Sequence, residues 1–314
     1  MGGLILRRLG ATVPVLLLVT AGVFALLHLT PGDPIDAMLA ESQDPVAKAA
    51  LRAELGLDRA IPVQYAAWMA RVLRGDLGRS IRNGEPVVEN VGRRLRPSLQ
   101  LAVLAMAISL LVAFPVGLVS AYRRNTAVDR AGTTFALFGI CMPNFLLALL
   151  LIFLFGVILR WLPISGYVDP LEEPWDGFRS LLLPGVTLGL ALGAVVTRTL
   201  RSSLVDALGE DYVRTARAKG VAEWRIMRRH VLKNALLPVV TVLGLQLGTL
   251  IGGAVITEYV FALPGVGRLV VDAVFARDYP LVQGVVLLIA LGFIVCNLLV
   301  DMLYGWIDPR IRYR

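Results

Sequence analysis

Six long apolar stretches constrain the fold of this 314-residue chain more than any other feature. Each is close to the roughly twenty residues that a helix needs to cross a hydrocarbon core about 30 Å thick. They lie at about residues 9–29, 99–122, 133–159, 181–199, 236–260 and 281–304. Because 57% of the residues are apolar and only 17% are charged, one water-soluble core could not bury them. The sequence therefore predicts an all-α polytopic membrane protein with six spans.

The distribution of Lys and Arg predicts which ends face the cytoplasm, since basic residues near span ends are retained on that side. Seventeen lie in the N-terminus, in the links 122–130 and 198–233, and after residue 304, against four in the short loops opposite. Both termini are therefore expected in the cytoplasm. The segment 31–98 holds ten more, but a loop of this length is translocated largely regardless of charge. The net charge of +8 needs no nucleic-acid partner.

Helix punctuation predicts that the loop 31–98 folds outside the cytoplasm. Asp44 and Pro45 can start a helix that stops at Gly56, and Pro62 can start a second one that stops at Gly75. The second carries an apolar stripe of Tyr65, Trp68, Met69 and Val72. This stripe either lies on the membrane surface or caps the bundle, or, alternatively, it docks an external partner or forms a lid on the pathway. The expected organisation is a tail and first span (1–30), this loop (31–98) and a five-span core (99–314).

One large cytoplasmic link, residues 198–233, is basic and predicts two helices outside the bilayer. A helical pattern runs from Ser202 to Lys219, and Gly220 is placed as its stop. Its apolar face comprises Val205, Leu208, Tyr212 and Ala216. A second pattern over 223–233 has apolar residues at Trp224, Met227, Val231 and Leu232 and arginines at 225, 228 and 229. A solvated loop explains the charges alone, but the apolar stripes need a covering surface.

The sequence contains no energy source that we recognise. A nucleotide-binding loop needs Gly followed by Lys and Ser or Thr, whereas Lys48, Lys219 and Lys233 follow Ala or Leu. Proton carriers place Asp, Glu or His at mid-membrane, and the six stretches have none near their centres. Two distant histidines and two cysteines in apolar runs indicate no metal site. We expect a chain that is not an enzyme and holds no cofactor, although sodium coupling at broken helices stays open.

Small and mildly polar residues stand out within the apolar stretches. Two runs of the GxxxG type allow close approach of helices: Gly185, Gly189 and Gly193, and Gly244, Gly248 and Gly252. They indicate packing within the subunit or, alternatively, a mobile or inter-subunit seam. Polar side chains on a span face protein or water rather than lipid. The candidates for pore lining or for hydrogen bonds between helices are Asn144, Thr187, Thr197, Gln246, Thr249, Gly253 and Thr257.

Seven segments in order make the whole chain resemble a known family. They are LTPGDP (29–34), LGLDRAIPVQYAAW (55–68), GDLGRSI (75–81), DYVRTARAKG (211–220), RHVLKNALLPVVT (229–241), ITEYVFALPGVGRL (256–269) and NLLVDMLYGWIDPRIR (297–312). The resemblance is to the permease subunits of bacterial ABC importers for peptides and nickel, specifically the B-type dipeptide and oligopeptide permeases. It implies the type I importer permease fold in the bacterial inner membrane.

The resemblance also implies that residues 200–235 form a coupling loop that docks on an ATPase subunit. The general importer pattern there is Glu-Ala-Ala, three residues, Gly, nine residues, then Ile-x-Leu-Pro. Aligned on Gly220, this sequence has Arg-Thr-Ala and His-Val-Leu-Lys instead, so the glycine turn carries over but individual salt bridges do not. Three acidic residues nearby are the expected substitutes. The candidate coupling residues are Glu210, Asp211, Arg214, Thr215, Ala216, Gly220, Glu223, Arg228 and Arg229.

The partners that the resemblance implies are a second, homologous permease subunit in a heterodimer, two ATP-binding subunits or domains that hold ATP and Mg, and an extracytoplasmic substrate-binding protein. The helices of 44–75 and the loop 262–280 are the expected face for substrate transfer. We expect an importer of dipeptides or oligopeptides. An importer of nickel or another small solute, and a stand-alone secondary carrier or channel, are the alternatives.

Overall fold

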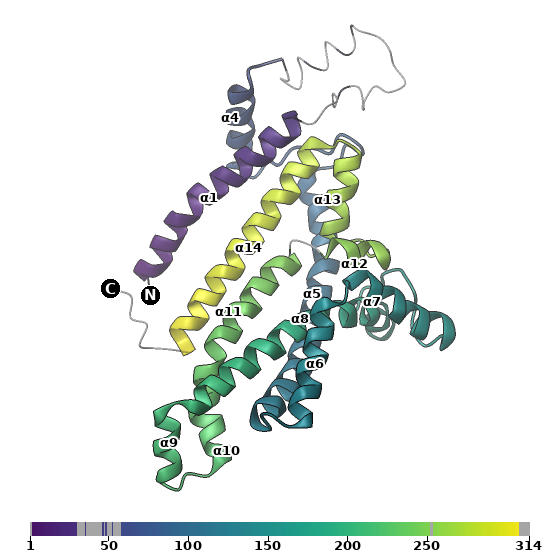
Figure 1. Ribbon diagram of the computed structural model, residues 1–314. Helices are drawn as coiled ribbons and strands as arrows, with labels where there is room; N and C mark the ends of the chain where they lie inside the picture. The colour runs from purple at the N-terminus through teal and green to yellow at the C-terminus, as the bar shows by residue number, and fades with distance from the viewer. Residues whose placement is uncertain are drawn as a thin grey trace. The chain divides into compact units, whose positions relative to one another are not determined.

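The computed structural model describes residues 2–29, 35, 46, 48, 52, 58–251 and 254–307 (Figure 1). Regular structure within these residues is helical, apart from one isolated bridge between Arg79 and Pro86. The elements are α1 (Gly2–Leu29), α4 (Ile61–Val72), α5 (Val87–Tyr122), α6 (Ala127–Cys141), α7 (Asn144–Leu151), the π-helix η1 (Ile152–Ile158), α8 (Pro174–Gly209), α9 (Asp211–Ala218), α10 (Glu223–Ile226), the π-helix η2 (Met227–Val231), α11 (Leu232–Ile251), α12 (Val255–Val260), α13 (Val266–Phe275) and α14 (Tyr279–Ile307).

Four of the described helices are long and apolar enough to cross a membrane: Val87–Tyr122, Pro174–Gly209, Glu223–Leu250 and Tyr279–Met302. A fifth candidate is the pair Ala127–Cys141 and Asn144–Ile158, bent by 103°. In α1, the apolar helix Thr12–Ala25 is shorter than these. The all-α membrane class is thus confirmed, while the described residues give four or five long candidate spans rather than six.

Two predicted spans are broken in the structure. The expected span 133–159 bends at Met142, whose φ of −75° and ψ of 122° are extended. Met142 precedes Pro143, and the proline ring disfavours the helical conformation in the residue before it. The expected span 236–260 ends as α11 at Ile251, and α12 starts separately after the non-helical Ala254. The expectation of continuous helices at these two places was wrong.

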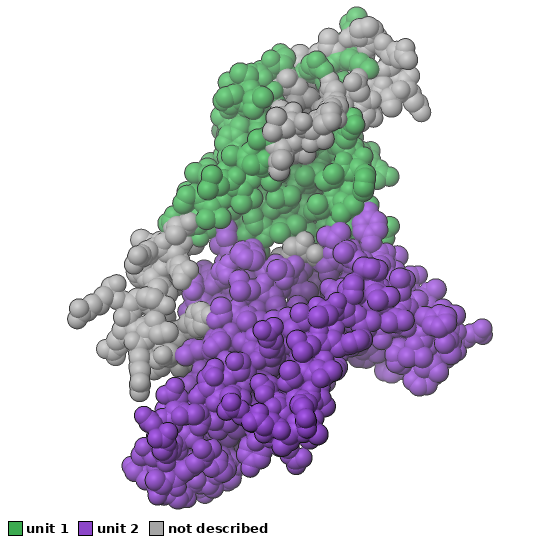
Figure 2. All heavy atoms as spheres, in the orientation of Figure 1, with its two compact units in different colours: residues 1–96, 264–292 green, residues 97–263, 293–314 purple. Residues whose placement is uncertain are grey.

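The chain forms two compact units (Figure 2). Unit 1 comprises residues 1–96 and 264–292, and unit 2 comprises residues 97–263 and 293–314. The first residues of α5 and the first half of α14 belong to unit 1, and the remainder of both helices belongs to unit 2. The core of unit 1 joins α5, α13 and α14 through Val87, Val91, Val266, Leu269, Ala273, Leu281, Val282 and Val285.

In unit 2, α5 lies against the glycine run of α8. A Cβ atom at Gly189 would lie 2.8 Å from the Ile108 Cβ and 2.9 Å from the Ala105 carbonyl oxygen. Gly185 meets Leu104, and Gly193 meets the backbone of Ser109. These glycines therefore occupy the places where the two backbones approach most closely.

The glycine run of α11 lies against α14. Gly244 meets the Val300 side chain and Gly248 meets the ring of Phe293. Gly252, the third member of the predicted run, lies outside the described residues. In the part of unit 2 that is described, both predicted runs thus contact a neighbouring helix of the same chain.

Candidate coupling site

The candidate coupling site is the helical hairpin that follows α8. Glu210, with φ of −71° and ψ of 150°, ends α8 and starts α9 in a new direction. The hairpin then turns at residues 219–222 and returns through α10 and η2 into α11, so that α9 and α10 lie together at one end of α8 and α11 (Figure 1). The prediction of one continuous helix from 202 to 219 was wrong, because the extended Glu210 divides it.

Gly220 closes α9 in a left-handed conformation with φ of +73°. Its N–H donates to the Arg217 carbonyl oxygen at 2.9 Å, and the N–H of Val221 donates to the Ala216 carbonyl oxygen at 3.1 Å. This pair of bonds is the Schellman motif, in which two N–H groups after the helix donate to its last carbonyl oxygens. The motif needs a left-handed residue at this place, and glycine adopts that conformation without a steric penalty because it has no Cβ atom. The structure therefore places Gly220 where the sequence placed it, as the stop of the first helix of the hairpin.

A hydrophobic core attaches the hairpin to the spans. Val213, Ile226 and Val231 of the hairpin are fully buried. Their cluster also contains Ala113 and Ala121 of α5, Val196, Leu200, Leu204 and Ala207 of α8, and Ala235 and Val239 of α11. The apolar side of the hairpin is thus covered by the ends of α5, α8 and α11 of the same chain. Because such a core is close-packed and deforms little, a displacement of the hairpin also displaces these helix ends.

The predicted apolar faces are only partly correct. Val205, Leu208 and Ala216 are half-buried against this core, as are Met227 and Leu232. Tyr212 and Trp224 are instead exposed. The fully buried Val213 and Ile226 were missed. The chain turns at Glu210, so a pattern drawn for one continuous helix does not apply to Val213, and Ile226 lies directly before the π-helix η2, whose period differs from that of an α-helix.

The exposed face of the hairpin carries the candidate coupling residues. All of them are exposed except Ala216, which is half-buried. Trp224 is 62% exposed, and the Arg225 guanidinium lies over its ring at 5.5 Å from the centroid. An exposed tryptophan among basic residues is typical of a binding surface, where aromatic anchors contribute most of the energy.

Two ion pairs order the charges on this face. Arg217 donates to both carboxylate oxygens of Glu223 at 2.7 and 3.2 Å, across the glycine turn. This hydrogen bond raises the pKa of Arg217. Asp211 and Arg214 pair more loosely at 3.4 Å. Sequence reasoning named Glu223 but missed Arg217, its partner.

The candidate pore residues are mostly engaged by the backbone. The hydroxyls of Thr187 and Thr197 donate to carbonyls one turn earlier in α8. The Gln246 side-chain amide donates to the Leu192 carbonyl oxygen at 3.2 Å, which joins α11 to α8. Thr249 donates to the Gln246 carbonyl oxygen. Asn144 is exposed at the bend after α6, Thr257 is buried in α12, and Gly253 lies outside the described residues. Pore lining stays a prediction.

The apolar stripe of α4 packs on α1. The Trp68 side chain is buried, with its ring centroid 6.0 Å from that of Phe24, and the Tyr65 ring lies 5.4 Å from Phe24. The hydroxyls of Tyr65 and Thr20 are hydrogen-bonded at 2.9 Å. Met69 and Val72 are half-buried. This packing favours the capping alternative, so external docking by the stripe stays a prediction. The helix expected at 44–56 falls almost entirely outside the described residues.

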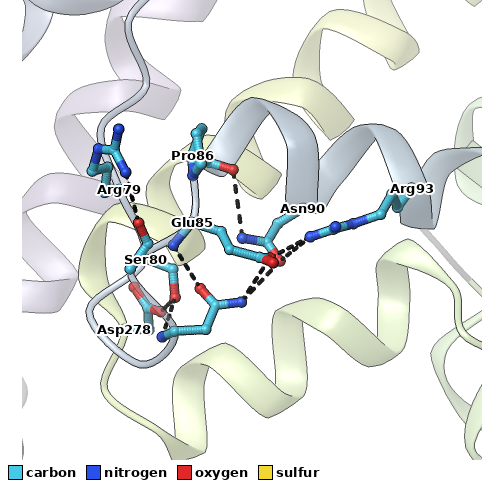
Figure 3. A network of polar contacts seen from close by, with 9 residues as sticks. Arg79, Ser80, Glu85, Pro86, Asn90, Arg93 and Asp278 are labelled. Atoms are coloured by element: carbon cyan, nitrogen blue, oxygen red, sulfur yellow. Dashed lines mark hydrogen bonds and ion pairs between the residues drawn. The ribbon is translucent and has the colours of Figure 1, made fainter.

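In unit 1, Asp278 joins the turn 75–86 to the start of α14 (Figure 3). Its buried carboxylate accepts hydrogen bonds from the Ser80 hydroxyl and from the N–H groups of Ile81 at 3.1 Å and Arg82 at 3.4 Å. It also accepts the N–H of Leu281 at 3.3 Å and so caps α14. The loop 262–280, a predicted transfer face, is thus tied to the GDLGRSI segment. The sequence analysis did not single out Asp278, because an aspartate between two predicted helices does not indicate a contact with a segment about 200 residues earlier.

The comparisons with known proteins agree along the whole chain. The probable peptide ABC transporter permease protein y4tP of Sinorhizobium fredii is 44% identical over 315 residues, which cover 100% of both chains. The glutathione transport system permease protein GsiC of Salmonella typhimurium is 44% identical over 310 residues, or 99% of both chains. An inward-facing structure of the MetNI methionine ABC transporter has the same fold, with a TM-score of 0.58 and 17% identity over 70% of this chain and 96% of that one.

The family matches divide at the second span. Residues 1–102 match the N-terminal part of the binding-protein-dependent transport system membrane components. Residues 113–313 match the family described as the binding-protein-dependent transport system inner membrane component. Together with the full-length relatives, these matches show that the chain belongs to the inner-membrane permease components of binding-protein-dependent ABC transport systems.

Proposed function

We propose that this permease imports peptides, in the size range from dipeptides to oligopeptides, with energy from ATP hydrolysed on partner subunits. The names of its relatives support the substrate class, since they are given as peptide and glutathione transport permeases, and glutathione is itself a short peptide. The candidate coupling hairpin supports the proposal that ATPase subunits supply the energy. Its exposed face could bind such a subunit, and its buried residues share a core with α5, α8 and α11, so that a movement of the hairpin would reach these helices.

The proposed assembly has four kinds of component. A second, homologous permease completes the pathway, two ATP-binding subunits or domains dock on the coupling hairpins, and an extracytoplasmic binding protein delivers the peptide. Both termini and the hairpin lie in the cytoplasm, as the excess of Lys and Arg on that side requires. When ATP draws the ATPase subunits together, the hairpins approach and turn α8 and α11, which opens the pathway to alternate sides.

Reconstitution tests this function directly. Proteoliposomes that contain this chain with its partner permease, the ATPase subunits and the binding protein are expected to accumulate a labelled dipeptide only with ATP and Mg. Liposomes with this chain alone, under a sodium or proton gradient, are expected to accumulate none. Uphill uptake by the chain alone would identify a secondary carrier, and ATP-dependent uptake of nickel without peptide would identify the metal importer.

Trp224→Ala is expected to weaken binding of the ATPase subunits by about ten- to a hundredfold, the range for loss of an aromatic anchor. The side chain is 62% exposed, so its removal leaves the fold intact. Titration of the purified ATPase subunit against the permease in nanodiscs measures this affinity. Trp175→Ala is the matched control, because Trp175 is also exposed but lies at the other end of α8. Equal loss in both variants would contradict the docking role.

A further inference from the structure

An ion pair between a buried aspartate and a half-buried arginine joins α6 to α8 near the candidate coupling hairpin. The Arg201 guanidinium donates to both carboxylate oxygens of Asp129, at 2.5 and 2.7 Å. Asp129 is only 4% exposed. Its Oδ2 also accepts the N–H of Asn125 at 2.9 Å, and Asn125 has φ of +64° in the turn between α5 and α6. One carboxylate therefore fixes three segments: the α5–α6 turn, the first turn of α6 and the last part of α8.

The position of Arg201 links this pair to the hairpin. Arg201 lies on α8 ten residues before Asp211, the first residue of α9. Its neighbours Leu200 and Leu204 are fully buried in the core that contains Val213 and Ile226 of the hairpin. At this level α8 is thus bound by hydrophobic contact to the hairpin and by the ion pair to α6.

The ion pair adds a bond of defined orientation to the apolar packing between α6 and α8. Gly139 of α6 meets Ala194 of α8, so the two helices also touch close to the end of α6. A contact between two small residues is weak by itself and fixes no single orientation of the two helices. A bidentate guanidinium–carboxylate pair has one favoured geometry, and separating it leaves the charge of the buried Asp129 uncompensated. Turning of α8 without α6 would therefore break the pair.

We propose that Asp129 and Arg201 are a positioning pair that makes α6 move as one body with α8 and the coupling hairpin. Movement of the hairpin then reaches the bend at residues 142–143 and the half-helix α7 beyond it. The inference rests on the proposed function, since it assigns the pair a task in transmitting the ATP-driven movement. Neither residue contacts substrate in this role.

The first test measures peptide molecules imported per ATP hydrolysed in the complete reconstituted transporter. Asp129→Asn and Arg201→Met are each expected to lower this ratio by about tenfold, within the coupling energies of contacting residues, while ATP hydrolysis continues. Because both remove the same interaction, the double variant is expected to be no worse than either single one. Arg201→Lys keeps the charge but loses the fork, so an intermediate ratio is expected.

Asp176→Asn is the control for this test. It removes a carboxylate that pairs with Arg179 of α8 at 3.5 Å, but in an exposed pair at the opposite end of the helix. Its ratio is expected to equal that of the parent protein. If Asp129→Asn lowers only the melting temperature of the transporter and leaves the ratio unchanged, the pair is merely structural and the proposal is overturned.

A distance measurement separates this inference from the proposed function. Spin labels replace Arg130 of α6 and Asp206 of α8, both exposed and neither among the candidate coupling residues, in a variant without Cys141 and Cys296. With the ATPase subunits bound, the label-to-label distance is expected to be the same without nucleotide and with ATP, and to change with ATP in Asp129→Asn. A distance that changes in the intact pair would overturn the proposal. This readout needs no peptide, so failure of peptide uptake leaves it valid.

Discussion

Replacement of Gly220 by valine is expected to lower ATP-driven uptake at least tenfold while the chain still inserts and the ATPase subunits still hydrolyse ATP. The reason is the backbone: at φ of +73° a residue with a branched Cβ costs about 1–3 kcal/mol, so the turn opens. The Schellman bonds at Arg217 and Ala216 are then lost, and the exposed face of the hairpin no longer matches its partner. Uptake and ATP hydrolysis are measured on the same proteoliposomes.

Gly209→Val is the matched control for this experiment. A Cβ atom meets nothing within 4 Å at Gly209 or at Gly220, but Gly209 lies in the last turn of α8 and has no left-handed φ. The two variants therefore differ in backbone conformation and not in local crowding. Normal uptake by the Gly220 variant, at expression equal to that of the control, would show that this turn does not transmit the movement.

Gly189→Ala is expected to lower the melting temperature of the purified permease by about 2–8 °C, and Gly189→Val to prevent correct folding. The added Cβ would lie 2.9 Å from the Ala105 carbonyl oxygen, and a backbone atom in the middle of a packed helix cannot move aside cheaply. Thermal unfolding and the monodisperse fraction on size exclusion in detergent measure the two effects.

Substitutions at Gly22 are the control for those at Gly189. Gly22 lies in the last third of α1, is exposed, and a Cβ atom added there would contact nothing within 4 Å. Gly22→Ala and Gly22→Val are expected to leave the melting temperature within about 2 °C of the parent protein. If substitutions at Gly189 are tolerated as well as those at Gly22, the helices α5 and α8 do not meet as closely as described.

Local signals in the sequence were sufficient for the class of fold and for some boundaries. Apolar length alone indicates the spans of α5, α8 and α14, because a bilayer imposes that length on any helix that crosses it. Gly220 could be recognised as a stop, since the left-handed cap favours glycine at that place. The bend at Met142 had a local signal too, the following proline, but the continuous apolar run outweighed it in our interpretation.

Interactions between distant segments could not be predicted in this way. Arg201 looked like one more solvated charge of a cytoplasmic link, and nothing in the sequence pairs it with Asp129, 72 residues earlier. Val213 is buried because the chain turns at Glu210, a turn that the helical pattern did not require, and Ile226 is buried because α10 packs on α5, α8 and α11. Asp278 joins two segments only through its tertiary contact with the turn 75–86, which local sequence does not reveal. In each case tertiary contact, rather than local preference, decided the structure.

The hairpin keeps its inward and outward side chains in separate sets. Val213, Ile226 and Val231 pack the hairpin against the ends of the spans. Arg214, Trp224 and the other exposed residues do not belong to that buried cluster. The exposed residues can therefore be exchanged to match a different ATPase subunit without loss of folding. A protein engineer could do this by grafting the exposed residues of a related permease onto the buried framework of this hairpin.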